Sequence, residues 1–141
     1  MRKRTKAREC ALQILYQIDI TKNDCRFCLD DYWNVNGDTE QSIVEFANEL
    51  VKGTVENVSK IDGVISSYAT NWSIDRMAVV DRNILRMATY ELLFRMEIPP
   101  KVSINEAVDI AKKFGDKDSG KFVNGILDKI SKVEKVDGKE S

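Results

Sequence analysis

Apolar residues recur at helical spacing along almost the whole chain, and this feature constrains the fold more than any other. In each segment they stand three or four positions apart, so that they share one face of a helix. No segment shows the sustained two-residue alternation of a half-buried strand. We therefore predict an all-α fold, a bundle of about six to seven helices.

Capping and breaking residues set the expected boundaries of these helices. The expected ranges are 5–20, 25–33, 38–68, and segments around 77–92, 103–115 and 118–132. The range 38–68 is long for a globular helix, and we expect it to bend or break at Gly53, at Gly63 or within 57–59.

Three helix ends carry more specific signals. Ser73 is expected to cap the helix that follows it, with Asp75 favourably placed in the first turn. Ser103 and Glu106 have the spacing of a capping box, which predicts that they open a helix. Gly115 is placed to cap the end of that helix.

The length of 141 residues is that of one domain. We expect a single domain over 1–132 and a charged, disordered tail over 133–141. Arg8, Glu9 and Gln13 interrupt the segment where a secretory signal would need a continuous apolar run. The chain is therefore expected to be cytoplasmic, with its three cysteines as free thiols.

Positive charge is concentrated at the N-terminus. Arg2, Lys3, Arg4, Lys6 and Arg8 place five of the 22 basic residues in the first eight positions, whereas all 23 acidic residues follow. This pattern predicts a mobile basic arm over 1–8 on an acidic body, and such arms bind polyanions. Docking on anionic lipid would need exposed aromatic residues beside the cations, so RNA is the favoured partner.

Motifs that would support catalysis are almost missing from the sequence. The chain has no histidine, which removes the commonest general base and most catalytic zinc sites. Cys25 and Cys28 form a CxxC pair, but the third cysteine, Cys10, stands alone and cannot complete a zinc site. We interpret the pair as structural thiols and predict a protein that is not an enzyme and uses no metal.

The segment 115–121 fits the glycine and lysine spacing of a phosphate-binding loop. The next residue is Phe122, where that loop needs Ser or Thr, and Asp116 and Asp118 would repel a triphosphate. No nucleotide cofactor is therefore expected. Phe122 lies beside Lys121 at the edge of its apolar stripe, which fits either a core-edge position or base stacking.

Along nearly its full length, the chain resembles the NusB family of transcription antitermination factors. The resemblance is carried by four segments in the same order, 7–16, 81–92, 104–108 and 122–128, which read ARECALQILY, DRNILRMATYEL, INEAV and FVNGILD. Four separated motifs in order are far more specific than any one of them.

The resemblance implies a small all-α RNA-binding protein of two helical sub-bundles. Members of the family pair with NusE, a small-subunit ribosomal protein, and bind the single-stranded boxA element of nascent ribosomal RNA leaders. They then join NusA, NusG and RNA polymerase to suppress termination. Both monomers and homodimers occur in the family, and the resemblance leaves both open for this chain.

Site residues follow from the resemblance by position. The RNA-binding set is Arg2, Lys3, Arg4, Lys6 and Arg8 at the N-terminus, with Asp118, Lys121 and Phe122 as a second patch. Tyr16 and Asp81 resemble contacts to NusE. Two of the five N-terminal cations are lysines, which lack the planar fork of arginine. The alternative is a helical adaptor whose basic arm docks an acidic protein and binds no RNA.

Overall fold

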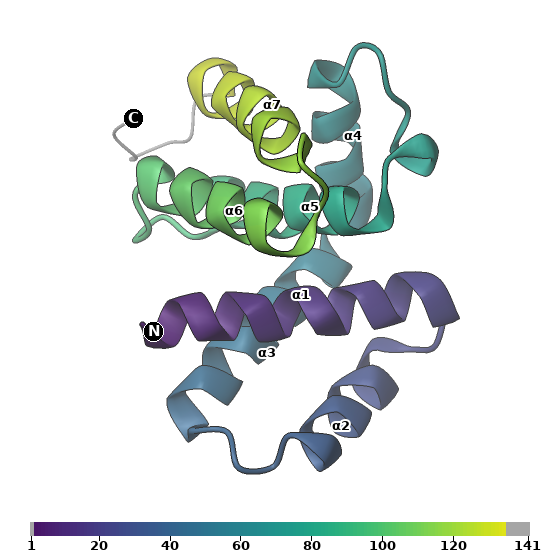
Figure 1. Cartoon of the computed structure of the whole chain (residues 1–141), viewed down its shortest axis with the longest axis vertical. Coiled ribbons are helices and arrows are strands. Elements are labelled where there is room, and N and C mark those ends of the chain that lie inside the picture. Colours follow the sequence, from purple (N-terminus) through teal and green to yellow (C-terminus); the bar gives the residue numbers. More distant parts are fainter. Residues whose placement is uncertain (1, 135–141) are drawn as a thin grey trace. The chain divides into compact units, whose positions relative to one another are not determined.

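The computed structural model describes residues 2–134, and every regular element in this range is helical (Figure 1). It contains seven α-helices and one short 3-10 turn, η1, within the described range. The chain divides between Glu56 and Asn57 into two compact units. The predicted all-α class, the number of helices and the division into two helical units are confirmed.

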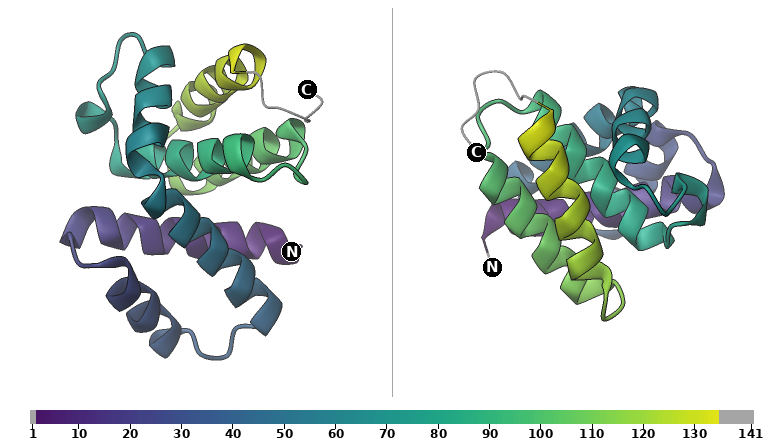
Figure 2. Two further views of the ribbon diagram at one scale, coloured as in Figure 1. Left: turned by 180° about the vertical axis from the view of Figure 1, so that it is seen from behind. Right: turned by 90° about the horizontal axis from the view of Figure 1, so that it is seen from above.

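The first unit consists of α1 (Lys3–Thr21), α2 (Cys25–Val35) and α3 (Gln41–Glu56). Helix α1 crosses α3 and packs closely against it, and α2 packs against both (Figure 2). Helix α2 begins with a side-chain cap, because the carboxylate of Asp24 accepts a hydrogen bond from the Phe27 backbone at 3.1 Å. The largest fully buried side chains of this unit are Ile14 and Leu50.

The second unit consists of α4 (Val58–Tyr68), η1 (Ile74–Arg76), α5 (Val79–Phe94), α6 (Pro100–Phe114) and α7 (Ser119–Val133). Helices α5, α6 and α7 pack against one another, and α4 packs against α5 and α7. Isoleucine and leucine dominate the core, and the side chains of Ile65, Ile84, Leu92, Leu127 and Ile130 are fully buried.

Several predicted helix boundaries are confirmed. The stretch 38–68 breaks at Asn57, within one of the three places expected, whereas Gly53 and Gly63 lie inside helices. Gly115 caps α6, although its backbone is extended rather than left-handed. Helix α7 begins at Ser119 after Asp118, as predicted.

Two of the predicted caps are wrong. Ser73 precedes η1 rather than α5, and its side chain makes no capping hydrogen bond. Helix α6 begins at Pro100, because the fixed φ and missing N–H of proline suit a first helical position. Ser103 and Glu106 therefore lie inside α6, and the buried Ser103 hydroxyl donates to the Glu91 carboxylate on α5 at 2.8 Å.

The end of the chain falls mostly outside the described residues. The tail is predicted to begin at residue 133, but Val133 is the last residue of α7 and Glu134 follows it. The first residue of the predicted tail is therefore helical. The remainder of that tail, 135–141, lies outside the described residues. Within residues 2–134, no helix is long and apolar enough to cross a membrane.

Candidate nucleic-acid interface

The N-terminal cations are helical rather than carried on a mobile arm. Only Arg2 precedes α1, and the first backbone hydrogen bond of the helix joins Lys6 N–H to the Arg2 carbonyl at 3.1 Å. The prediction of a mobile arm over 1–8 is therefore wrong for residues 3–8. The first turn of α1 has neither an acidic residue nor a side-chain cap to stabilise it. Its helical form therefore depends on the packing of α1 against α3.

Three of these cations contact α3 or the loop before it. Lys3 Nζ pairs with a carboxylate oxygen of Glu40 at 2.7 Å, and the Arg4 guanidinium lies 4.2 Å from the centre of the Phe46 ring. The Arg8 guanidinium lies 5.5 Å from the same ring, and Arg8 is only 3% exposed. Because Arg8 is buried against this ring, its guanidinium is not available for the phosphate contacts predicted for it. The exposed cations are Arg2, Lys3, Arg4 and Lys6.

The turn between α6 and α7 is closed by reciprocal hydrogen bonds. The Asp116 N–H donates to Ser119 Oγ at 3.0 Å, while Asp116 Oδ1 accepts from the Asp118 N–H at 2.8 Å and from the Ser119 hydroxyl at 3.3 Å. A Cβ atom at Gly115 would collide with Ser119 Oγ. The first glycine of the apparent phosphate-binding loop is thus required by close packing.

Asp118 and Phe122 line a cavity of about 450 Å³ in the second unit. The other lining residues are Trp72, Arg76, Met77, Ala78, Asp81 and Asp116. The Phe122 and Trp72 rings meet edge to face, with centroids 6.5 Å apart and planes at 83°. The structure therefore brings two residues of the predicted RNA patch together with Asp81, which the resemblance assigned to a protein partner. Lys121 is exposed and lies outside this lining.

Asp81 lies in the first turn of α5 and is 8% exposed. Its Oδ1 atom is buried and has no hydrogen-bond partner among the described residues. Burial raises the pKa of the Asp81 carboxyl, the Ser119 hydroxyl opposes this rise, and the negative charge of Asp116 adds to it. Ser119 thus contacts the Asp81 carboxyl, whereas the Oδ1 atom of that carboxyl is shielded from solvent and has no partner among the described residues.

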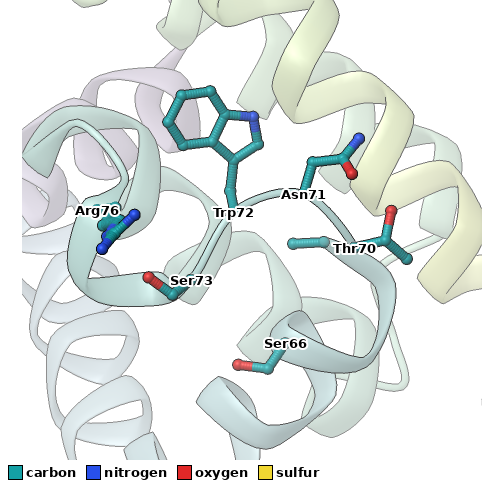
Figure 3. A pocket seen from close by; sticks show the side chains of 7 residues that line it. Ser66, Thr70, Asn71, Trp72, Ser73 and Arg76 are labelled. Carbon is teal, nitrogen blue, oxygen red and sulfur yellow. The ribbon is translucent and has the colours of Figure 1, made fainter.

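A second hollow, of about 560 Å³, adjoins this cavity (Figure 3). Ser66, Ala69, Thr70, Asn71 and Ser73 line it together with Trp72 and Arg76, which the two hollows share. Sequence reasoning misses Trp72 and Arg76, because the signals in this segment point only to Ser73 and Asp75 at the start of a helix. The available signal was a large aromatic residue within a polar turn, and Trp72 is indeed 52% exposed.

The remaining predicted contact, Tyr16, lies on α1 in the first unit and is 43% exposed. The cysteines lie in the same unit as free thiols. Burial raises the pKa of both the Cys25 and the Cys28 thiols, which keeps them protonated and unreactive. Within the described residues, no group of His, Cys, Asp and Glu side chains could hold a metal ion.

Comparison with known proteins shows the family to which this fold and surface belong. The NusB family pattern matches residues 5–132. The transcription antitermination protein NusB of Thermodesulfovibrio yellowstonii is 45% identical over 141 residues, covering 94% of this chain and 93% of that protein. The corresponding protein of Anaeromyxobacter sp. is 48% identical over 129 residues, covering 92% of this chain and 90% of that protein.

Solved structures show the same fold. NusB of T. maritima superposes with a TM-score of 0.84 at 41% identity, over 94% of this chain and 92% of that one. A crystal structure of the antitermination factors NusB and NusE in complex with dsRNA superposes with a TM-score of 0.85 at 33% identity, over 94% of this chain and 98% of that one.

The fold and its surface thus define a small all-helical protein of the transcription antitermination class. The chain belongs to the NusB family, whose members are non-enzymatic antitermination factors.

Proposed function

We propose that this chain binds boxA-type single-stranded RNA of nascent ribosomal RNA leaders together with NusE. The observation that carries the proposal is the solved complex of NusB and NusE with dsRNA. One protein chain of that complex superposes on 94% of this chain at 33% identity. In the cytoplasm, the pair would join NusA, NusG and RNA polymerase in an antitermination complex.

Two kinds of side chain are proposed to contact the RNA. Arg2, Lys3, Arg4 and Lys6 are exposed and supply positive charge for phosphates, with Lys121 as a further cation on α7. Phe122 and Asp118 line the cavity and are proposed to contact bases. Phosphate contacts position a strand and base contacts specify its sequence, so the two sets have different roles.

NusE is proposed to contact Tyr16, whose ring is 43% exposed on α1. Asp81, the other residue that the resemblance assigns to this partner, is 8% exposed, so only a group that enters the cavity can reach its carboxylate. The binding surface for RNA grows when NusE joins, so we expect the pair to bind RNA more tightly than the chain alone.

The test is the fluorescence anisotropy of a boxA-type single-stranded RNA over a salt series, with and without NusE. Binding to single strands weakens with a log-log slope of about −0.7 for each phosphate neutralised, so the four exposed N-terminal cations predict a contribution of about −2.8. The double variant Arg2→Ala/Lys6→Ala should reduce this slope by about 1.4.

The matched control is Lys101→Ala/Lys129→Ala, which removes two exposed lysines from α6 and α7 and changes the net charge equally. Equal slopes for the two double variants would show that only overall charge matters. Failure of the intact chain to bind RNA with NusE present would replace the proposal with a protein adaptor. A double-stranded version of the same RNA tests whether an unpaired strand is preferred.

A further inference from the structure

Two asparagines of the chain are followed directly by glycine, and the structure places them in different settings. Asn36 and Gly37 lie in the turn after α2, whereas Asn124 and Gly125 lie within α7. Beside a glycine, an asparagine side-chain amide is open to attack by the next backbone nitrogen, because glycine has no side chain to obstruct the approach. The two pairs therefore have the same reactive groups and differ in the backbone that holds them.

The backbone nitrogen of Gly37 is available for this attack. Gly37 is exposed, and its N–H donates no hydrogen bond within residues 2–134. The Asn36 side chain donates from Nδ2 to the Tyr32 carbonyl at 2.9 Å. The Asn36 carbonyl accepts from the Thr39 N–H at 3.2 Å and from the Thr39 hydroxyl at 2.8 Å. Rotation of Asn36 toward a reactive geometry therefore opens a single turn at the end of α2.

The second pair is protected by the helix around it. Gly125 lies six residues beyond Ser119, the first residue of α7, so its N–H is one of the regular i to i−4 donors of that helix. Asn124 and Gly125 are both exposed, so access of water does not distinguish this pair from the first. The neighbouring side chains of Val123 and Ile126 are buried in the core. Attack by the Gly125 nitrogen requires opening the middle of a packed helix, which is far less frequent than opening a turn.

We propose that Asn36 is a site of spontaneous covalent modification, in which the Gly37 nitrogen displaces the amine of the Asn36 side-chain amide. A bond forms between the Gly37 nitrogen and Asn36 Cγ, the Cγ–Nδ2 bond breaks, and the displaced amine leaves as ammonia with the proton of the Gly37 N–H. Water then opens the cyclic imide at either carbonyl carbon. The products are aspartate and isoaspartate, in which the chain continues through the side chain. The co-reactant is solvent water, and the inference is independent of the proposed RNA-binding function.

The modification changes the end of α2. Residue 36 caps this helix, and a carboxylate in place of the amide has no N–H to donate to the Tyr32 carbonyl. The new negative charge lies at the carbonyl end of α2, where the helix dipole favours positive charge. Isoaspartate also lengthens the backbone of the turn by one methylene group. The modified turn is therefore less stable than the original one.

The first experiment follows both pairs in the intact chain. The folded protein is incubated at mildly alkaline pH, which favours loss of the backbone N–H proton, and samples are digested with trypsin. Cleavage gives peptides 27–52 and 122–129, each of which contains one of the two pairs. Mass spectrometry detects replacement of the amine by a hydroxyl, and fragmentation locates it. We expect Asn36 to be converted about tenfold faster than Asn124, or more, because a turn opens more readily than a helix interior.

The unfolded chain is the internal control. In guanidinium chloride both pairs lose the backbone that distinguishes them, so their rates of conversion should become similar. The products identify the route of the reaction. Attack by the backbone nitrogen gives isoaspartate together with aspartate, whereas direct hydrolysis of the amide gives aspartate alone.

The second experiment changes the glycine. A Cβ atom added at Gly37 meets the Trp33 carbonyl oxygen at an ordinary 3.6 Å, and the φ of Gly37 lies outside the left-handed region, so Gly37→Ala should fold. It should slow conversion of Asn36 about tenfold, because the added Cβ restricts the backbone and hinders the attack. The matched control is Gly125→Ala, which changes the other glycine and should leave the rate at Asn36 unchanged. Circular dichroism melting confirms that each variant is folded.

The consequence for α2 is tested by Asn36→Asp, which reproduces one of the products. The matched control is Asn34→Asp, which adds the same charge at an exposed position in the last turn of α2. We expect Asn36→Asp to unfold at the lower urea concentration, because it alone loses the hydrogen bond to the Tyr32 carbonyl. Equal midpoints would contradict the predicted effect on the turn.

Three results would overturn the inference itself. Equal rates at Asn36 and Asn124 in the folded protein would show that the turn does not favour attack by the Gly37 nitrogen. Formation of aspartate without isoaspartate would exclude that nitrogen as the attacking group. An unchanged rate in folded Gly37→Ala would show that the glycine is not required.

Discussion

Arg86 on α5 and Asp62 on α4 form a bidentate ion pair, with Nε to Oδ1 at 2.8 Å and the second guanidinium nitrogen to Oδ2 at 2.9 Å. Both side chains are mostly shielded from water, with exposures of 16% and 29%. Bidentate pairs in such positions are stronger and more directional than exposed ones. This pair fixes the contact between α4 and α5.

Arg86→Lys is expected to destabilise the protein, because a lysine cannot make both bonds. We expect a loss of about 1.5 to 3 kcal/mol in the free energy of unfolding, measured by urea denaturation. A double-mutant cycle with Asp62→Asn isolates the pair, and additive losses would show that the two side chains do not interact. The control is Lys132→Ala, which removes the exposed partner of Asp128 and should cost well under about 1 kcal/mol.

Gly115→Ala is expected to destabilise the turn between α6 and α7. The added Cβ would collide with Ser119 Oγ and lie 2.8 Å from the Ala111 carbonyl oxygen, so the turn must shift. We expect a loss of about 1 to 3 kcal/mol in denaturant unfolding. The control is Gly125→Ala in α7, where an added Cβ would meet no atom of another described segment within 4 Å, and which should stabilise by up to about 1 kcal/mol. Equal stability of the two variants would contradict the steric explanation.

Tyr16→Ala is expected to weaken NusE binding, because an exposed aromatic ring contributes large apolar contact area at a protein interface. A loss of about 1 to 3 kcal/mol in binding free energy should appear in calorimetry. Phe27→Ala is the matched control, since Phe27 is 54% exposed on α2 of the same unit. An equal loss for both variants would show that the ring at position 16 is not specific for this partner.

Sequence patterns predicted the helices well because apolar spacing reports directly on which face is buried. They failed at the starts of two helices, where the residues of a predicted cap competed with another signal for helix or turn formation nearby. Pro100 starts α6 three residues before the apparent capping box at Ser103, and η1 occupies the position where Ser73 would have capped a long helix.

The site was predicted only in part, since its geometry depends on tertiary contacts. The charge pattern identified the N-terminal cations, but it could not show that Arg8 packs against Phe46, a residue of another helix. Phe122 and Asp118 were identified by resemblance, whereas Trp72 and Arg76 join them only because η1 lies beside the turn before α7. That proximity has no signature in a single sequence.

Asp81→Asn is expected to make the stability of the protein less sensitive to pH. Burial raises the pKa of Asp81 above its ordinary value of 3.8, so folding favours the protonated carboxyl. The stabilisation linked to Asp81 is therefore complete below 3.8 and is lost as the pH rises through the folded-state pKa. The amide introduced by Asp81→Asn carries no charge at any pH, so the variant does not lose stability as the pH rises.

The variant should therefore be more stable than the original chain near neutral pH, and this difference should shrink as the pH falls through the folded-state pKa and level off below 3.8. Denaturant unfolding of both proteins across this range measures the difference. Asp75→Asn, which removes a carboxylate from the exposed turn η1, subtracts the general effect of losing one negative charge. A difference that stays constant with pH, or that grows on acidification, would contradict a raised pKa at Asp81.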